Sequence, residues 1–406
     1  MKNLSDVFLK VRNKGLRHIV TESIPWFLYD KLNTPLSNIL QKYFLQKPVQ
    51  DVIILESHND FDSNGGAFYD YLINNKYNQK YKIVWFLRNK CPQGLPENVE
   101  GYRYNRLSIK RIYYHCVAKY ILSEHYAIPA IREEQVAVFM RHGAGGLKKV
   151  LNYFTLPGGV HYILGLSEAY APIEKDSYFT NKNQKILYLG FPSHDYLFKD
   201  NHVEIKKIDN RSYKKVLLWM PTFRKTVDER NDSSAVFPLG IPLIEKYDDY
   251  KKMNELLAQL NLLLIIKIHP MQELDSLKIH NMSNIKVITG NDVKKLNVDN
   301  YKLMSCCDAM ISDYSGAAYD FLQLDRPMAY VLNDMNEYKI GFVVEDIHTL
   351  IAGKEIYSLG DMLDFIKDVS VDKDEFKEKR EKIRDFIYTY HDNNNSKRLA
   401  DFLGLD

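Results

Sequence analysis

Short apolar runs of strand length alternate with helix-like segments along most of this 406-residue sequence. A β-α-β alternation of this kind predicts parallel sheets with helices on both faces. The helical segments are expected after 67, at 109–117, 247–260 and 317–324, and within 374–403. The runs expected to be strands are 51–55, 82–87, 120–122 and 136–140 in the first half, and 216–220, 262–268, 285–288, 309–311 and 328–332 in the second.

Two such series follow one another, so we expect an α/β chain of two Rossmann-like domains facing a cleft, where ligands usually bind. A charged stretch at 199–215 separates the two series. The expected parts are an N-terminal segment (1–48), an acceptor domain (49–198), a nucleotide-donor domain (214–375) and C-terminal helices (376–406) that pack back on the first domain.

The overall composition limits the class of protein. There are 55 lysines and arginines against 52 acidic residues, for a formal net charge of +3. A dedicated nucleic-acid binder is normally strongly basic, so that role is disfavoured. Four cysteines without metal-ligand spacing fit a reducing cytoplasm and no metal site, and Cys306-Cys307 should be buried packing. No apolar stretch is long enough to span a bilayer and no signal peptide is evident, so we expect a cytoplasmic protein.

The N-terminal segment differs from the rest of the sequence. Its first twenty residues hold five basic residues against one acid, with apolar residues near helical spacing, and Trp26-Phe27 follows. A basic amphipathic helix beside aromatic residues is typical of a helix lying at a membrane surface. The alternative is a helix docked on its own domain.

The residues that follow each strand matter most, because ligands of open α/β sheets bind beyond the carboxyl ends of the strands. The run 136–140 leads into Arg141-His142-Gly143 and, after two more glycines, Lys148. Glycines let the backbone approach a ligand, and an imidazole that titrates near neutrality can serve as a base. This loop therefore suits an anion with a general base at its entrance, the alternative being a glycine-rich turn.

Strand ends in the second half add basic and hydroxyl side chains. Arg224 could hold a phosphate bidentately beside the hydroxyl of Thr222, and Lys267 with His269 suits an anionic ligand. The last of these strands runs into a helix start whose free N–H groups favour a diphosphate, although an ordinary helix cap is the alternative. The residues there are Ser312, Asp313, Ser315, Gly316 and, one turn further, Asp320.

Taken in order, these motifs resemble the CDP-glycerol glycerophosphotransferases, the teichoic-acid polymerases and primases of bacterial envelopes. The resemblance implies a GT-B-like fold, a CDP-alditol donor as substrate, and no cofactor or metal. It also implies a lipid-linked or glycan acceptor and a peripheral position on the inner face of the cell membrane. It covers about residues 50–402 and rests on His142-Gly143, 221–224, 267–270 and 311–316, with Glu56-Ser57, 190–192, Arg326-Pro327, Asp334 and Tyr338 fitting the same layout.

The resemblance also implies a role for each motif residue. His142 and His269 would be catalytic, with His142 as the general base. Arg141, Gly143 and Lys148 would lie on the acceptor side. The donor would be bound by Thr222, Arg224, Lys267, Ser312, Asp313, Ser315, Gly316 and Asp320.

Three positions depart from the family pattern. Ala144-Gly145-Gly146 stands where the family has a Thr-Pro pair, Arg141 replaces a Trp, and Gly316 replaces the second Ser of a pair. The reaction class should therefore transfer better than the substrate. Two alternatives stay open: a GT-B glycosyltransferase that uses a nucleotide sugar, and a non-catalytic glycan- or lipid-binding module.

Overall fold

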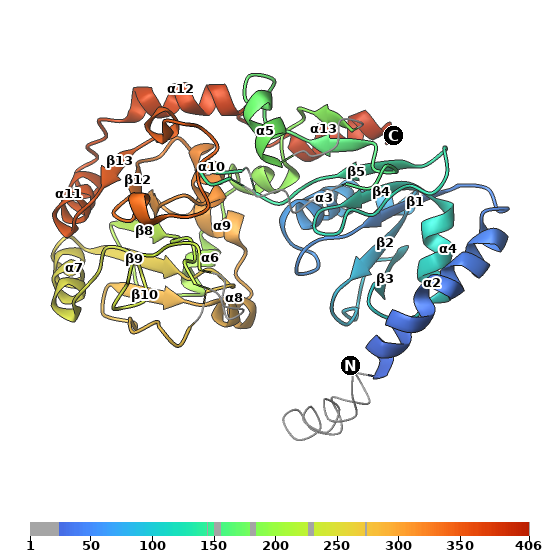
Figure 1. The fold of residues 1–406 in the computed structure, drawn as a ribbon, viewed down its shortest axis with the longest axis horizontal. Coiled ribbons are helices and arrows are strands. Elements are labelled where there is room, and N and C mark those ends of the chain that lie inside the picture. The colour runs from blue at the N-terminus through green and yellow to red at the C-terminus, as the bar shows by residue number, and fades with distance from the viewer. Residues whose placement is uncertain are drawn as a thin grey trace.

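A computed structural model describes residues 24–143, 145–149, 156–178, 184–225, 231–272 and 274–405. Within these residues the chain forms two parallel sheets, each covered by helices, in two lobes that lie side by side (Figure 1). The prediction of two Rossmann-like domains is confirmed. The part of the expected N-terminal segment before residue 24 lies outside the described residues.

The sheet of the N-terminal lobe has the strand order β3-β2-β1-β4-β5-β6-β7 in the part of the chain that is described. Its central strand β1 pairs in parallel with both β2 and β4. The apolar runs of these central strands are buried because helices cover both faces of the sheet. The strands are β1 (Gln50–Leu55), β2 (Lys82–Leu87), β3 (Val99–Arg103), β4 (Ala118–Ser123), β5 (Val136–Phe139), β6 (Tyr162–Leu164) and β7 (Lys185–Leu187).

The C-terminal lobe repeats this plan with the order β10-β9-β8-β11-β12-β13. Every strand that the sequence predicts is present. The four that it misses, β3, β6, β7 and β13, have only three to five residues. Strands β3, β7 and β13 lie at sheet edges and lack a continuous apolar run, and the apolar run of β6 is only three residues long. The strands are β8 (Lys215–Trp219), β9 (Leu262–Lys267), β10 (Ile285–Ile288), β11 (Ala309–Ser312), β12 (Met328–Val331) and β13 (Lys354–Ile356).

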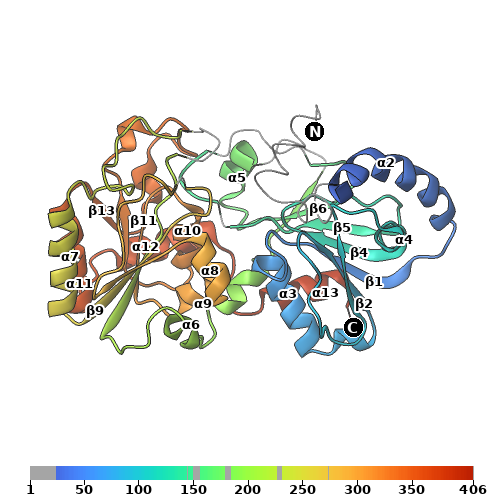
Figure 2. The ribbon, with the colours of Figure 1, turned by 90° about the horizontal axis from the view of Figure 1, so that it is seen from below.

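Helices cover both sheets (Figure 2). Cys306 and Cys307, at the end of α9, are free and buried, as the sequence predicts. In the N-terminal lobe the helices are α2 (Ile24–Phe44), α3 (Ser63–Asn74), η2 (Tyr77–Gln79), α4 (Ile109–Val117), α5 (Ala171–Tyr178) and η3 (Pro192–Tyr196). After these come α6 (Val203–Lys206), α7 (Tyr247–Gln259), α8 (Gly290–Leu296), α9 (Asn300–Ser305), α10 (Gly316–Leu322), η4 (Met335–Glu337), η5 (Ile347–Leu350), α11 (Leu359–Ser370), α12 (Lys377–Ile387) and α13 (Asn395–Leu403).

The last helix, α13, returns to the N-terminal lobe (Figure 1). The Tyr120 hydroxyl donates to the Leu403 carbonyl at 2.7 Å, and the Asp195 carboxylate accepts from the backbone N–H groups of Asn395 and Ser396 at 2.8 and 2.9 Å. The chain therefore crosses between the lobes twice, which holds the carboxyl ends of the two sheets facing each other.

Candidate active site

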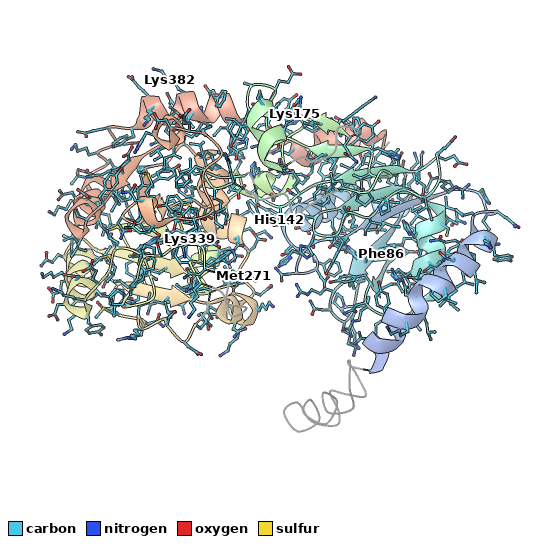
Figure 3. The ribbon with its side chains drawn as sticks, viewed as in Figure 1. Phe86, His142, Lys175, Met271, Lys339 and Lys382 are labelled. Atoms are coloured by element: carbon cyan, nitrogen blue, oxygen red, sulfur yellow. The ribbon has the colours of Figure 1, made fainter. Side chains whose placement is uncertain are left out.

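His142 lies between the two lobes, on the side of the N-terminal lobe that faces Met271 (Figure 3). Its ring and His58 from the N-terminal lobe are near enough to His269 of the C-terminal lobe to lower the pKa of His269. The strand ends of the two sheets therefore converge, as the sequence predicts. The two histidines assigned to catalysis belong to one site.

The His142 imidazole has the properties of a base. The side chain is solvent exposed although protein atoms surround it closely, as expected for a group in a cleft. Burial, then the neighbouring His58 and Arg141, lowers the pKa of His142, so the ring is neutral at pH 7. A hydrogen bond to the Glu124 backbone carbonyl occupies one ring nitrogen, so the other is left to accept a proton.

Arg141 points away from the cleft. Its guanidinium forms a buried ion pair with the Glu174 carboxylate at 2.5 Å, and the other oxygen of Glu174 accepts from the Leu166 backbone N–H at 3.2 Å. Arg141 also has a positive φ of 60°, followed by 71° at Gly143. The structure therefore places the Arg141 guanidinium under the loop, where it anchors the turn that presents His142, and its assignment to the acceptor side stays a prediction.

The glycine loop crosses onto the C-terminal lobe. A Cβ atom on Gly316 would lie 2.2 Å from the Gly145 carbonyl oxygen, and one on Gly146 would lie 2.9 Å from the Gly316 nitrogen. Backbone hydrogen bonds then join the next residues to the other lobe, from Lys149 N–H to Gly341 O at 3.0 Å and from Val343 N–H to Leu147 O at 2.8 Å. We call the described residues 145–149 the strap.

The strap carries Lys148 to the C-terminal lobe. Its ammonium lies 5.2 Å from the centre of the Phe223 ring, which in turn contacts the His269 ring at 4.7 Å. The Lys148 charge also helps to lower the pKa of His269. The structure brings Lys148 against the C-terminal lobe, and its assignment to the acceptor side stays a prediction.

His269 and Lys267 form the basic part of the C-terminal wall. Burial, with Lys148 and Lys267, lowers the pKa of His269 to about 3, so this ring is neutral. Its Nδ1 accepts from the Met271 backbone N–H at 3.1 Å, which assigns the proton to Nε2 as a donor. Burial lowers the pKa of Lys267 to about 8, with Asp299 acting in the opposite direction. Together they offer a neutral donor and a cation to an anionic ligand.

Arg224 and Thr222 are committed to a buried network. The Arg224 guanidinium donates to Asp334 at 2.7 and 3.0 Å and to Asp313 at 2.9 Å. Asp313 also accepts the Thr222 backbone N–H and hydroxyl. Burial disfavours the charged guanidinium, but the two carboxylates outweigh it and raise the pKa of Arg224. In the described chain these three side chains bond to one another and to Asp334, and their assignment to the donor's phosphates stays a prediction.

At the start of α10, some polar residues bond to other parts of the protein and others stay partly exposed. Ser312 is buried and its hydroxyl donates to the Met220 carbonyl at 3.2 Å, whereas Ser315 is partly exposed and caps α10 by accepting from the Ala317 N–H at 3.3 Å. Asp320 forms a buried hydrogen bond with His194 of the N-terminal lobe at 2.8 Å. Asp320 therefore joins the two lobes beneath the His142 loop. The assignment of Asp320 to the donor stays a prediction.

Sequence reasoning missed two histidines of the site, His58 and His125. They follow β1 and β4 directly, so the strand-end rule that singled out His142 applies to them as well. It also passed over the buried acid Glu124 at the end of β4, and it gave no role to Glu56 at the end of β1, whose pKa burial raises to about 7. In the described segments no group of three or more His, Cys, Asp or Glu side chains is arranged to hold a metal ion.

Two parallel-sheet domains that bring a neutral histidine opposite a basic wall suit an enzyme that binds an anionic substrate between them. The chain belongs to the CDP-glycerol:poly(glycerophosphate) glycerophosphotransferase family, whose model matches residues 39–404. It is therefore an enzyme of the glycerophosphotransferase class, which confirms the resemblance.

Among individual proteins, the chain is similar to the teichoic acid glycerol-phosphate primase of Bacillus subtilis strain 168, with 25% identity over 394 residues, covering 89% of this chain and 94% of that one. It is 22% identical over 321 residues to a teichoic acid ribitol-phosphate primase of Bacillus spizizenii, covering 72% and 76%. The solved wall teichoic acid polymerase TagF superposes with a TM-score of 0.69 at 18% identity, covering 98% and 97%. That likeness shows a shared fold.

Proposed function

We propose that this enzyme transfers a glycerol phosphate or similar alditol phosphate from a CDP-linked donor to a hydroxyl of a lipid-linked or polysaccharide acceptor in envelope or capsule polymer synthesis, with release of CMP. The observation that carries the proposal is the pairing across the cleft of the neutral His142 with the basic group of Lys148, Lys267 and His269. The family match and the relatives named for teichoic acid primases support the donor.

The reaction follows from these positions. The acceptor hydroxyl attacks the phosphorus that bears the alditol, and its proton passes to the free nitrogen of His142. The bond from that phosphorus to the oxygen of CMP breaks, and CMP leaves with the electron pair. His269 donates from Nε2 to the phosphate oxygens, while Lys148 and Lys267 offset their charge. Positioning and electrostatics therefore supply most of the rate enhancement.

Replacement of His142 tests the base. His142→Ala should lower turnover with CDP-glycerol by about 10²-fold or more, as expected for loss of a general base. The matched control is His202→Ala, because the His202 side chain is 79% exposed and pairs with the similarly exposed Asp200. Turnover of the His142 variant within a factor of a few of the parent would refute the assignment.

The released nucleotide tests the reaction class. Reactions with CDP-glycerol, CDP-ribitol, UDP-sugars and GDP-sugars are analysed by chromatography. The CDP-linked donors should release CMP, and no donor should release a nucleoside diphosphate. A nucleoside diphosphate would indicate a glycosyltransferase. Tight CDP binding without release of CMP across a panel of acceptors would favour the non-catalytic module.

A lipid-linked acceptor requires the enzyme to work at a membrane, and α2 offers a surface for this. No helix in the described part of the chain is long and apolar enough to cross a bilayer. One side of α2 packs through Leu36 and Leu40, but Ile39 and Tyr43 are 68% and 59% exposed, as is Ile109 of the adjacent α4 at 58%. An exposed apolar face of this kind fits a peripheral contact with the inner face of the membrane.

Vesicle flotation tests this contact. Changing Ile39 and Tyr43 together to Glu should lower binding to anionic phosphatidylglycerol vesicles severalfold, because two charges would enter the interface. Val371→Glu is the control, since Val371 is also 68% exposed but lies on the C-terminal lobe. Equal binding of the double variant and this control would contradict the contact.

A further inference from the structure

Three imidazoles meet at the carboxyl ends of three adjacent strands of the N-terminal sheet. His58 follows β1, His125 follows β4 and His142 follows β5. The rings of His58 and His125 are 4.4 Å apart, and each is 6.2 Å from the ring of His142. His58 and His125 are partly exposed, so the pair stands beside the base at the open edge of the sheet.

His58 and His125 form a hydrogen-bonded pair through their Nδ1 atoms, 3.1 Å apart. Burial lowers the pKa of each ring, with His125 adding to the effect on His58 and His142 adding to the effect on His125, so both are neutral at pH 7. In a neutral pair joined in this way one Nδ1 donates and the other accepts. The ring that donates then has a bare Nε2, and the ring that accepts has an Nε2–H. Whichever way the shared proton lies, the pair presents one acceptor and one donor, which is the complement of a hydroxyl group.

The backbone holds this pair rigidly. Asp60 and Phe61, next to His58, have positive φ values of 68° and 57°, a strained conformation for residues other than glycine. The Asp60 carboxylate fixes the loop by accepting from the backbone N–H groups of Arg88 and Asn89 at 2.7 and 2.8 Å. Strain maintained by specific contacts is found mainly where a site must be preorganised.

His125 is fixed from below. The buried Glu56 carboxylate accepts three backbone N–H groups, from Glu124 at 3.0 Å, His125 at 2.9 Å and Tyr126 at 3.1 Å. One carboxylate thus sets the path of the whole turn after β4. Both members of the pair are placed by buried or strained backbone and neither by a flexible surface loop.

We propose that His58 and His125 form an acceptor subsite that binds the hydroxyl next to the attacking one on a polyol acceptor, and so holds the attacking hydroxyl against His142. This rests on the proposed function and adds the chemical class of the acceptor end, a vicinal diol. The two histidines are positioning residues, because the proton passes to His142 and not to them. A diol supplies one oxygen for the reaction and a second for the pair.

Two soluble acceptors separate this role from a general structural one. The first is a short oligo(glycerol phosphate) that ends in free glycerol, and the second is the same oligomer ending in a 3-hydroxypropyl group, which keeps the attacking hydroxyl but lacks its neighbour. The parent enzyme should prefer the first by about tenfold in kcat/KM, the scale of one hydrogen bond. His58→Phe and His125→Phe keep the ring shape and remove the nitrogens, and each should abolish the preference.

Both Phe variants should lose much more rate with the first acceptor than with the second, because only the first has a hydroxyl for the pair. His58→Gln retains a donor and an acceptor and should restore part of the preference. His202→Phe, on a histidine that is 79% exposed, is the control. Retention of the diol preference by both Phe variants, or equal losses with both acceptors, would overturn the subsite. A parent enzyme that releases no CMP with either acceptor would overturn the proposed function and this inference together.

Discussion

Arg224 is a buried cation whose hydrogen bonds go to protein carboxylates. It lies 6% exposed in its side chain between Asp313 and Asp334, which are 0% and 1% exposed. The aromatic rings of Tyr314 and Tyr338 lie 5.0 and 5.4 Å from the guanidinium carbon. A buried charge of this kind is strongly destabilising to break, because each partner left behind is unpaired in a low dielectric. At the residue scale, Arg224 therefore stabilises the C-terminal lobe beside the cleft.

Arg224→Ala should lower the free energy of unfolding by about 3–5 kcal/mol, since it leaves two buried carboxylates without their cation. Chemical denaturation followed by fluorescence measures this. Arg211→Ala is the matched control, because the Arg211–Asp209 pair has a half-exposed arginine and should contribute at most about 1 kcal/mol. If the Arg224 variant is as stable as the parent but has a raised KM for CDP-glycerol, then Arg224 binds the phosphates of the donor and is not mainly structural.

The strap and α10 form one unit although they come from different lobes. The glycines at 145, 146 and 316 are among the positions where the sequence departs from the family pattern, and in the structure they approach one another closely. A side chain at 316 would occupy the place of the Gly145 carbonyl. These glycines therefore depend on one another, because a side chain at 146 or at 316 would displace the backbone of the other segment. At the element scale, this contact sets the height of the His142 loop above α10.

Gly316→Ala should displace the strap, because its Cβ would lie 2.2 Å from a backbone oxygen that has little room to move. We expect turnover to fall by about tenfold or more, since a small misplacement of a catalytic group is costly. Steady-state kinetics with CDP-glycerol measures it. Gly360→Ala is the control, because its Cβ would meet only the Ser358 hydroxyl at 3.5 Å. Parental turnover in the Gly316 variant would show that the strap does not position His142.

The charge state of the site depends on both lobes being in place. His269 of the C-terminal lobe is kept neutral by burial and by charges that include Lys148 from the strap. His142 of the N-terminal lobe is affected in turn by Asp320 of α10, which also bonds His194. At the scale of the whole molecule, the protonation of each of these two imidazoles thus depends on groups from the opposite lobe.

The pH dependence of turnover should follow from these shifts. Activity requires neutral His142, so it should fall as the pH drops through a pKa below the usual 6.5. It also requires cationic Lys267, so it should fall as the pH rises through about 8. His269, with a pKa of about 3, should add no limb above that value. A kcat/KM profile for CDP-glycerol from pH 4 to 10 tests this. Lys267→Arg should remove the upper limb, because a guanidinium stays charged throughout.

Local pattern was enough for the parallel strands, the two-domain plan, and the motifs His142-Gly143 and Lys267–His269. A buried parallel strand is a continuous apolar run, and a ligand site follows its carboxyl end, so both are visible in a few adjacent residues. Short edge strands such as β7 and β13 carry no such run. His58 and His125 obey the same strand-end rule, but each is a single residue with no motif around it.

Only the tertiary structure determines which groups each polar side chain contacts. Arg224 and Lys267 both follow apolar strands in the sequence, yet one is saturated by two carboxylates and the other lacks a carboxylate partner in the described chain. Likewise Gly145 and Gly316 are 171 positions apart and acquire a joint meaning only when the lobes meet. Sequence sets which residues stand at the strand ends, because periodicity is local. Partners come from distant segments, so their identity depends on how the two sheets are brought together.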